Sequence, residues 1–191
     1  MRAEEAPELL FGRPHPDGPL SKSLLDDAFA HHVWATVRLI DACIPLRPGQ
    51  LATNVPGTYG SIIETLRHLV DGDGFYLYGL TGDRAHGINT DHMDLRELQS
   101  AIKTNSAAWS RLLVQNPDPD AITLELDDDG FERRATTGIR FAQALHHGTD
   151  HRSQVCTALT SLGVEPPRID VWDFGKEAGR NIEIEPVQRH T

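Results

Sequence analysis

Apolar residues recur every three or four positions in long stretches of the chain, which is the spacing of helices that bury one face. These stretches cover residues 21–46, 61–80, 95–116 and 138–164. Each stretch is long enough for several helical turns, and the segments between them are rich in Gly, Pro, Asn and Asp. The pattern therefore predicts four long helices joined by loops.

Residues that begin and end helices bound these stretches. Ser21 or Ser23 can cap the first helix, and Asp91 or Asp94 can cap the third. Gly163 follows Leu162, the last apolar position of the fourth helical pattern, where a residue that tolerates positive φ is preferred. The capping residues thus agree with the periodicity about where the helices start and stop.

A strand-like pattern precedes the fourth helix. Ile122, Leu124 and Leu126 alternate with polar residues, and an Asp-Asp-Asp-Gly turn at 127–130 leads into Phe131. Alternation interrupted by a glycine-containing turn predicts a β-hairpin. The whole pattern predicts an all-α fold, a four-helix bundle with a small hairpin before the last long helix.

The length of 191 residues indicates one domain with a sizeable core. We expect the bundle to occupy residues 21–180, including a short further helix within 169–181. Residues 1–20, rich in Pro, Gly and charge, are predicted to form an extended arm. Residues 181–191 are predicted to form a tail.

Composition excludes several classes of partner. The formal net charge is −10 and there is no dense run of Lys or Arg, which argues against binding to nucleic acid. The sequence contains no run of 18 apolar residues, so it predicts no membrane span. The first 20 residues contain acids and prolines where a signal peptide needs a basic and then an apolar segment, so we expect a cytoplasmic protein. The two cysteines, Cys43 and Cys156, are predicted to be free thiols.

Histidines supply the candidate chemistry. His147 and His151 stand four residues apart in the fourth helix, so their side chains lie on one face, one turn apart. His68 lies at the border of the apolar face of the second helix. Alone, each would more often be a surface or core histidine. On facing helices of a bundle, however, three neutral imidazoles can form an open site for zinc, nickel or iron.

These residues resemble the DinB and YfiT-like family of metalloenzymes. The family pattern is a histidine in the second helix followed by H-x-x-x-H-R-x-Q in the last, and here "TLRHLV" and "HHGTDHRSQV" match it. The resemblance covers about residues 21–180. It implies that His68, His147 and His151 bind a divalent metal ion, with zinc or nickel favoured over iron or manganese. It also implies a homodimer.

Other polar residues near the predicted ligands are weaker candidates. Glu64, one turn before His68, could orient an imidazole or act as a general base, although a surface position is the simpler interpretation. Asp150 stands where many relatives have a histidine and could contact the ion. Gln154 could also reach the ion. His146 cannot share the face of its neighbour His147, because adjacent helical residues point about 100° apart, and is expected to be exposed or at an interface.

The sequence does not decide the roles of two histidines of the first helix and one arginine of the fourth. His31 and His32 precede Trp34, and His32 could contact the site or a substrate, or lie on the polar surface of the helix. Arg152 is offset from the ligand face and is expected to pair with an acid on another helix.

The sequence therefore predicts a metal-dependent enzyme acting on a small molecule. The resemblance implies a hydrolase or a thiol-dependent S-transferase, the latter with a low-molecular-weight thiol as partner. The alternative is a non-enzymatic metal-binding or stress-response bundle. Neither interpretation requires a nucleic acid or a membrane as partner.

Overall fold

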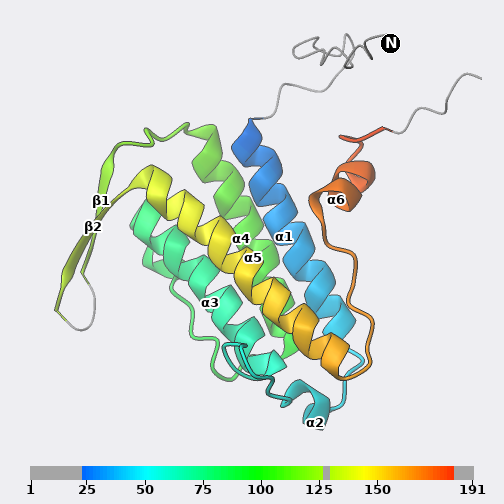
Figure 1. Ribbon diagram of the computed structural model, residues 1–191. Helices are drawn as coiled ribbons and strands as arrows, with labels where there is room; N and C mark the ends of the chain where they lie inside the picture. The colour runs from blue at the N-terminus through cyan, green and yellow to red at the C-terminus, as the bar shows by residue number, and fades with distance from the viewer. Residues whose placement is uncertain (1–22, 127–129, 183–191) are drawn as a thin grey trace, which may run out of the picture.

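A computed structural model describes residues 23–126 and 130–182 and shows the predicted bundle (Figure 1). Its elements in chain order are α1 (Leu24–Cys43), α2 (Pro48–Leu51), α3 (Ile62–Thr81), η1 (Arg84–His86), α4 (Leu95–Val114), β1 (Ile122–Leu126), β2 (Glu132–Thr136), α5 (Thr137–Ser161) and α6 (Val171–Glu177). The predicted arm at 1–20, residues 127–129 of the predicted turn and residues 183–191 of the predicted tail lie outside the described residues.

The four long helices, α1, α3, α4 and α5, lie side by side. Helix α1 packs against α4 and α5, and α3 packs against the same two helices from the other side. Antiparallel strands β1 and β2 form the predicted hairpin, which projects from one end of the bundle and leads directly into α5 (Figure 1). The short helix α6 lies along α1. None of the described helices combines the length and apolar character needed to cross a membrane.

Local side-chain chemistry sets the helix boundaries. The Ser23 hydroxyl accepts a hydrogen bond from the Asp26 amide, and the Asp26 carboxylate accepts one from the Ser23 amide. Asp94 and Glu97 form the same reciprocal cap on α4. The sequence had left Ser21 or Ser23 and Asp91 or Asp94 as alternatives, and the caps are therefore Ser23 and Asp94. Gly163, at φ 70°, follows the end of α5 as predicted.

Two short elements lie in segments predicted to be loops. Helix α2 begins at Pro48, whose missing amide proton costs nothing at a first helical position. The single turn η1 begins after Asp83, whose carboxylate accepts a hydrogen bond from the Ala85 amide. Elements of three or four residues have too few positions to show a period, which is why the apolar pattern missed them.

The core lies between the long helices. Leu39, Ile40, Leu66, Leu69, Leu77, Leu98, Ile102 and Leu159 have no exposed surface, and Trp109 is almost completely buried. The two cysteines are free, as predicted. Buried among these apolar residues are also polar side chains, including His32, Asp73 and Arg152.

Candidate metal centre

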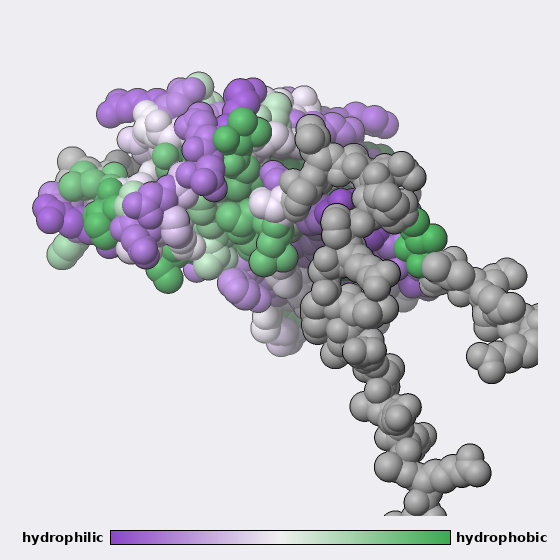
Figure 2. All heavy atoms as spheres, turned by 90° about the horizontal axis from the view of Figure 1, so that it is seen from above, coloured by the Kyte–Doolittle hydropathy of each residue, from purple (hydrophilic) through white to green (hydrophobic). Residues whose placement is uncertain are grey.

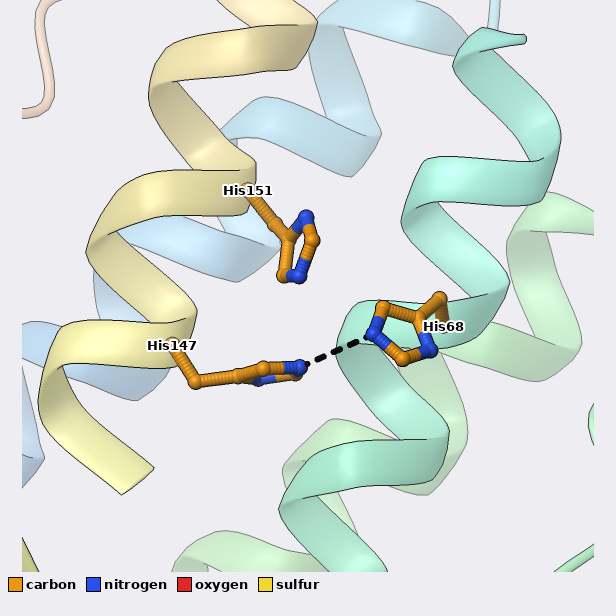
Figure 3. Close-up of side chains that lie close together, drawn as sticks. All are labelled: His68, His147 and His151. Carbon is orange, nitrogen blue, oxygen red and sulfur yellow. Dashed lines mark hydrogen bonds between the residues drawn. The ribbon is translucent and has the colours of Figure 1, made fainter. Parts of the chain in front are cut away.

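Three imidazoles converge between α3 and α5. His68 comes from α3, and His147 and His151 come from successive turns of α5 (Figure 3). One ring nitrogen from each lies within 4.8 Å of the other two. The Nε2 atoms of His68 and His147 are 3.2 Å apart. The predicted convergence of these three side chains is therefore confirmed.

The close approach of α3 and α5 depends on a glycine. A Cβ atom added at Gly72 would lie 2.4 Å from Cε1 of His147, well inside any van der Waals contact. Gly72 is one helical turn beyond His68, so the space left by its missing side chain lies on the same face of α3 as His68. The His147 ring occupies that space and is thereby directed at His68.

Two neighbouring residues hold the other rings in place. The Gln154 side-chain oxygen lies 3.1 Å from Nδ1 of His151 and also accepts a hydrogen bond from the Tyr59 amide at 2.9 Å. An amide oxygen can only accept, so Nδ1 of His151 carries the proton and its Nε2 keeps a free lone pair. The Tyr59 ring stacks on His68, with centroids 3.9 Å apart and planes 6° apart.

The electrostatic environment keeps imidazoles unprotonated. Burial lowers the pKa of His147 to about 4, with smaller contributions from His151 and His68. Burial also lowers the pKa of His68, and His151 adds to the effect. Near neutral pH these two rings are therefore uncharged, which is the form in which a histidine binds a metal.

These features fit a divalent metal ion. Tetrahedral ligand nitrogens at about 2.1 Å from an ion lie about 3.4 Å from one another, close to the His68–His147 separation. An outer hydrogen bond such as that from His151 to Gln154 is typical of metal-bound imidazoles. Within the described residues, no fourth His, Cys, Asp or Glu joins the cluster.

Glu64, Asp150 and His146 lie outside the three-histidine cluster. The Glu64 carboxylate accepts hydrogen bonds from the Ser61 amide at 2.8 Å and hydroxyl at 2.6 Å, and so caps α3. The hydroxyl and amide of Ser61 also lower the pKa of Glu64. Asp150 and His146 are exposed on α5. The exposure of His146 agrees with the prediction from helical geometry.

The histidines of α1 have roles that the sequence did not reveal. His32 is 2% exposed and bonds to Asp73 at 2.9 Å, so of its three alternatives the surface position and the substrate contact are excluded, and a buried position beside the site remains. Arg152 donates to His32 instead of pairing directly with an acid. His31 bonds to the carbonyl oxygen of Ile169 and its ring contacts Phe174, so it holds the segment that contains α6.

The centre adjoins two pockets of different character. The larger, about 930 Å³, is lined by His68, Tyr59 and mostly polar residues from α3 and the loop after η1, among them Glu64, Arg67, Asp71, Asn89 and Asp91. The smaller, about 340 Å³, has a mainly apolar surface and is lined by Phe75, Tyr76, Ala135 and Ile139 together with Arg133, Arg140 and Gln143. Tyr76 connects the second pocket to the centre, because its ring centroid lies 5.4 Å from that of His147.

Sequence reasoning missed Tyr59, Tyr76 and Asp73 as neighbours of the site. Tyr59 lies in a loop, where no periodicity indicates which way a side chain points. The helical spacing of Tyr76 indicates a core residue. Asp73 continues the spacing of Leu66, Leu69 and Leu77 along α3, and that placement of an acid on an apolar face was a readable signal of a buried polar group.

The fold and the centre together define a helical-bundle protein with a three-histidine site suited to a divalent metal. The model of the DinB family matches residues 21–185, and the chain belongs to this family. No curated protein matches the chain.

Proposed function

We propose that this protein is a metal-dependent enzyme that acts on a small molecule, as a hydrolase or as a thiol-dependent S-transferase. The observation that carries the proposal is the convergence of the three imidazoles beside a pocket, with no fourth side-chain ligand from the described residues. A structural zinc site usually has four protein ligands, whereas a catalytic site leaves a position open.

His68, His147 and His151 would hold the ion, with zinc or nickel favoured and iron or manganese as alternatives. A bound divalent ion would supply Lewis-acid chemistry, polarising a substrate oxygen or lowering the pKa of water or of a thiol. Gln154 keeps Nε2 of His151 available, and Tyr59 covers one face of His68. These contacts orient the ligands before any substrate arrives.

The two pockets suggest what kind of substrate would fit. The larger one presents carboxylates, amides and the Arg67 guanidinium, groups that recognise hydroxyl, amine or carboxylate substituents. The smaller one presents Phe75 and Ile139, which would take an apolar group. A small molecule with a polar part and an apolar part would place the bond between them near the histidines.

The experiment compares metal-stripped protein with protein loaded with zinc, nickel, iron or manganese. Each form is offered esters and amides, and separately a low-molecular-weight thiol together with an electrophile. Turnover that requires the metal and is lost in His147→Ala supports the proposal. Stoichiometric metal binding without turnover of any substrate would favour the alternative, a metal-binding or stress-response bundle.

We also propose a homodimer that forms through exposed apolar surface. Viewed from above, apolar side chains gather at the end of the bundle that carries the hairpin (Figure 2). Exposed there are Leu24, Val114 and Ile139 at helix ends, and Ile122, Leu124 and Phe131 on the hairpin. A second copy of the chain would cover such a patch. Sedimentation at micromolar concentration tests this, and a monomer would count against it.

A further inference from the structure

A second group of polar side chains lies in the core, beside the metal centre. Its middle is Asp73 of α3, which is 2% exposed. One carboxylate oxygen accepts hydrogen bonds from Nε2 of His32 and from Nε1 of Trp109, both at 2.9 Å. The other oxygen accepts one from the Asn105 amide at 2.7 Å. Donors from α1 and α4 thus meet on one acid of α3.

The same group extends to α5 through Arg152, which is 3% exposed. Its guanidinium donates to Nδ1 of His32 at 3.1 Å and to the Thr36 hydroxyl at 3.2 Å. Because Nδ1 accepts from Arg152, the His32 proton lies on Nε2 and is donated to Asp73. His32 is therefore neutral and connects a buried cation to a buried anion. We call His32, Thr36, Asp73, Asn105, Trp109 and Arg152 the Asp73 network; it joins all four long helices.

The network and the metal centre use adjacent residues of the same helices. On α5, Arg152 follows His151, and Gly148 follows His147. A Cβ at Gly148 would lie 2.4 Å from Cε1 of His32, so the His32 ring rests on the α5 backbone. On α3, Asp73 follows Gly72, which accommodates the His147 ring. On α5, therefore, the histidines of the centre and the residues at the network are sequence neighbours, with directions about 100° apart. Any rotation of α5 about its axis moves both sets together.

We propose that the Asp73 network positions the metal ligands by fixing the rotation and axial register of α5 against α1 and α3. This inference rests on the proposed metal site. Apolar packing is non-directional and tolerates small shifts of one helix along another, whereas hydrogen bonds to Asp73 require particular distances and angles. Turning α5 out of this register would carry His147 and His151 away from His68.

The test measures zinc affinity and the visible absorption spectrum of the cobalt-substituted protein, neither of which requires a known substrate. Asp73→Asn keeps the shape of the side chain but puts an amide where three donors meet, and it removes the buried anion that His32 connects to Arg152. We expect the zinc dissociation constant to rise by about 10–100-fold, as when outer partners of metal ligands are lost. The cobalt spectrum should change because the ligand positions change.

A compensating variant separates positioning from a general loss of stability. In Asp73→Asn combined with Asn105→Asp, the amide and the carboxylate exchange helices. Residue 73 still accepts from His32 and Trp109 through its oxygen, and its amide donates to residue 105, so every hydrogen bond around residue 73 can be remade. We expect zinc affinity and the cobalt spectrum to return most of the way toward those of the unmodified protein.

The matched control is Leu98→Ala, which removes a fully buried side chain of α4 outside the network. It should lower the melting temperature while leaving zinc affinity within a few-fold. If it weakens zinc binding as much as Asp73→Asn does, or if Asp73→Asn binds zinc normally, the network has no positioning role.

A second variant covers the case in which Asp73→Asn fails to fold. Thr36→Val removes one acceptor from Arg152, and unchanged zinc affinity in Thr36→Val overturns the inference. An unmodified protein that binds no metal would instead refute the proposed function.

Discussion

At the scale of single residues, the centre depends on glycines as much as on histidines. Gly72 and Gly148 stand where a methyl group would strike His147 and His32, respectively. Neither has the positive φ that usually explains a glycine in a protein. Their role is close approach: they let an imidazole from one helix lie against the backbone of another.

Gly72→Ala tests this role. The added methyl group would lie 2.4 Å from the His147 ring, so the ring must move away from His68. We expect a loss of about 1–3 kcal/mol in the free energy of unfolding and a weaker zinc affinity. Gly49→Ala is the control, because nothing lies within 4 Å of the position that its methyl group would take. Denaturant titration and zinc titration of both variants provide the measurements, and normal zinc binding by Gly72→Ala would contradict the expectation.

His147→Ala should remove one of the three proposed metal ligands directly. We expect zinc affinity to fall by more than the roughly 10–100-fold typical of losing an outer partner. The zinc-dependent rise in melting temperature should disappear, because an ion stabilises a protein only by binding its native state. His146→Ala is the matched control, since its side chain is exposed on the same helix. Equal metal loss in the two variants would show that the ligand face is assigned wrongly.

The three histidines of the centre could be found from the sequence, whereas the sequence signals only that Asp73 is buried and not which side chains it bonds to. His147 and His151 are linked by helical spacing, His68 lies at the border of an apolar face on a facing helix, and the family resemblance assigned all three as ligands. His32 and Asp73 depend on a pairing between α1 and α3 that no local pattern encodes. For His32 the sequence left a contact with the site or a substrate and a polar surface position as alternatives, because buried polar groups are rare unless they are paired. Only the tertiary structure shows that they are paired.

At the scale of elements, the sequence predicted the long helices and the hairpin well because local chemistry agrees with the apolar period at each of them. Reciprocal caps at Ser23 and Asp94 start α1 and α4, and Gly163 follows the end of α5. The short elements α2 and η1 were missed, since their conformation follows from single residues and not from a repeating pattern.

Asp94→Ala tests the contribution of one cap. The Asp94 carboxylate accepts hydrogen bonds from the amides of Arg96 and Glu97, at 2.8 and 2.9 Å. Removing it leaves those amides without their partner, so we expect a loss of about 0.5–2 kcal/mol in the free energy of unfolding. Ser100→Ala, at an exposed position in the same helix, should change stability by much less. The comparison requires only denaturant unfolding, and an equal effect of both variants would contradict the capping role.

At the scale of the whole molecule, two systems share one bundle. The candidate metal centre lies between α3 and α5, and the Asp73 network joins those helices to α1 and α4. The apolar core supplies most of the stabilisation, and the polar contacts add directional constraints to it. Stability and metal binding are therefore expected to respond together to conditions that charge the buried imidazoles.

Lowering the pH should destabilise the metal-free protein through His147. Burial lowers its pKa from 6.5 to about 4 in the folded state, whereas the unfolded chain keeps the ordinary value. Between these values the unfolded state binds more protons, so the free energy of unfolding falls as pH falls from about 6.5 to about 4 and then levels off. One proton limits the slope to about 1.4 kcal/mol per pH unit, and the partial exposure of the ring makes it smaller.

Comparison with His147→Gln isolates this effect from the titration of carboxylates. The stability of the unmodified protein minus that of the variant should decrease across this window in metal-free buffer. With zinc present, this stability difference should be larger at pH 7 than it is in metal-free buffer. The extra part due to zinc should disappear toward pH 4.5, because protons compete with the ion for the histidine nitrogens. A difference that is independent of pH in metal-free buffer would show that His147 titrates normally in the fold. Zinc still bound at pH 4.5 would mean that a carboxylate, such as Asp150 or Glu64, shares the ion.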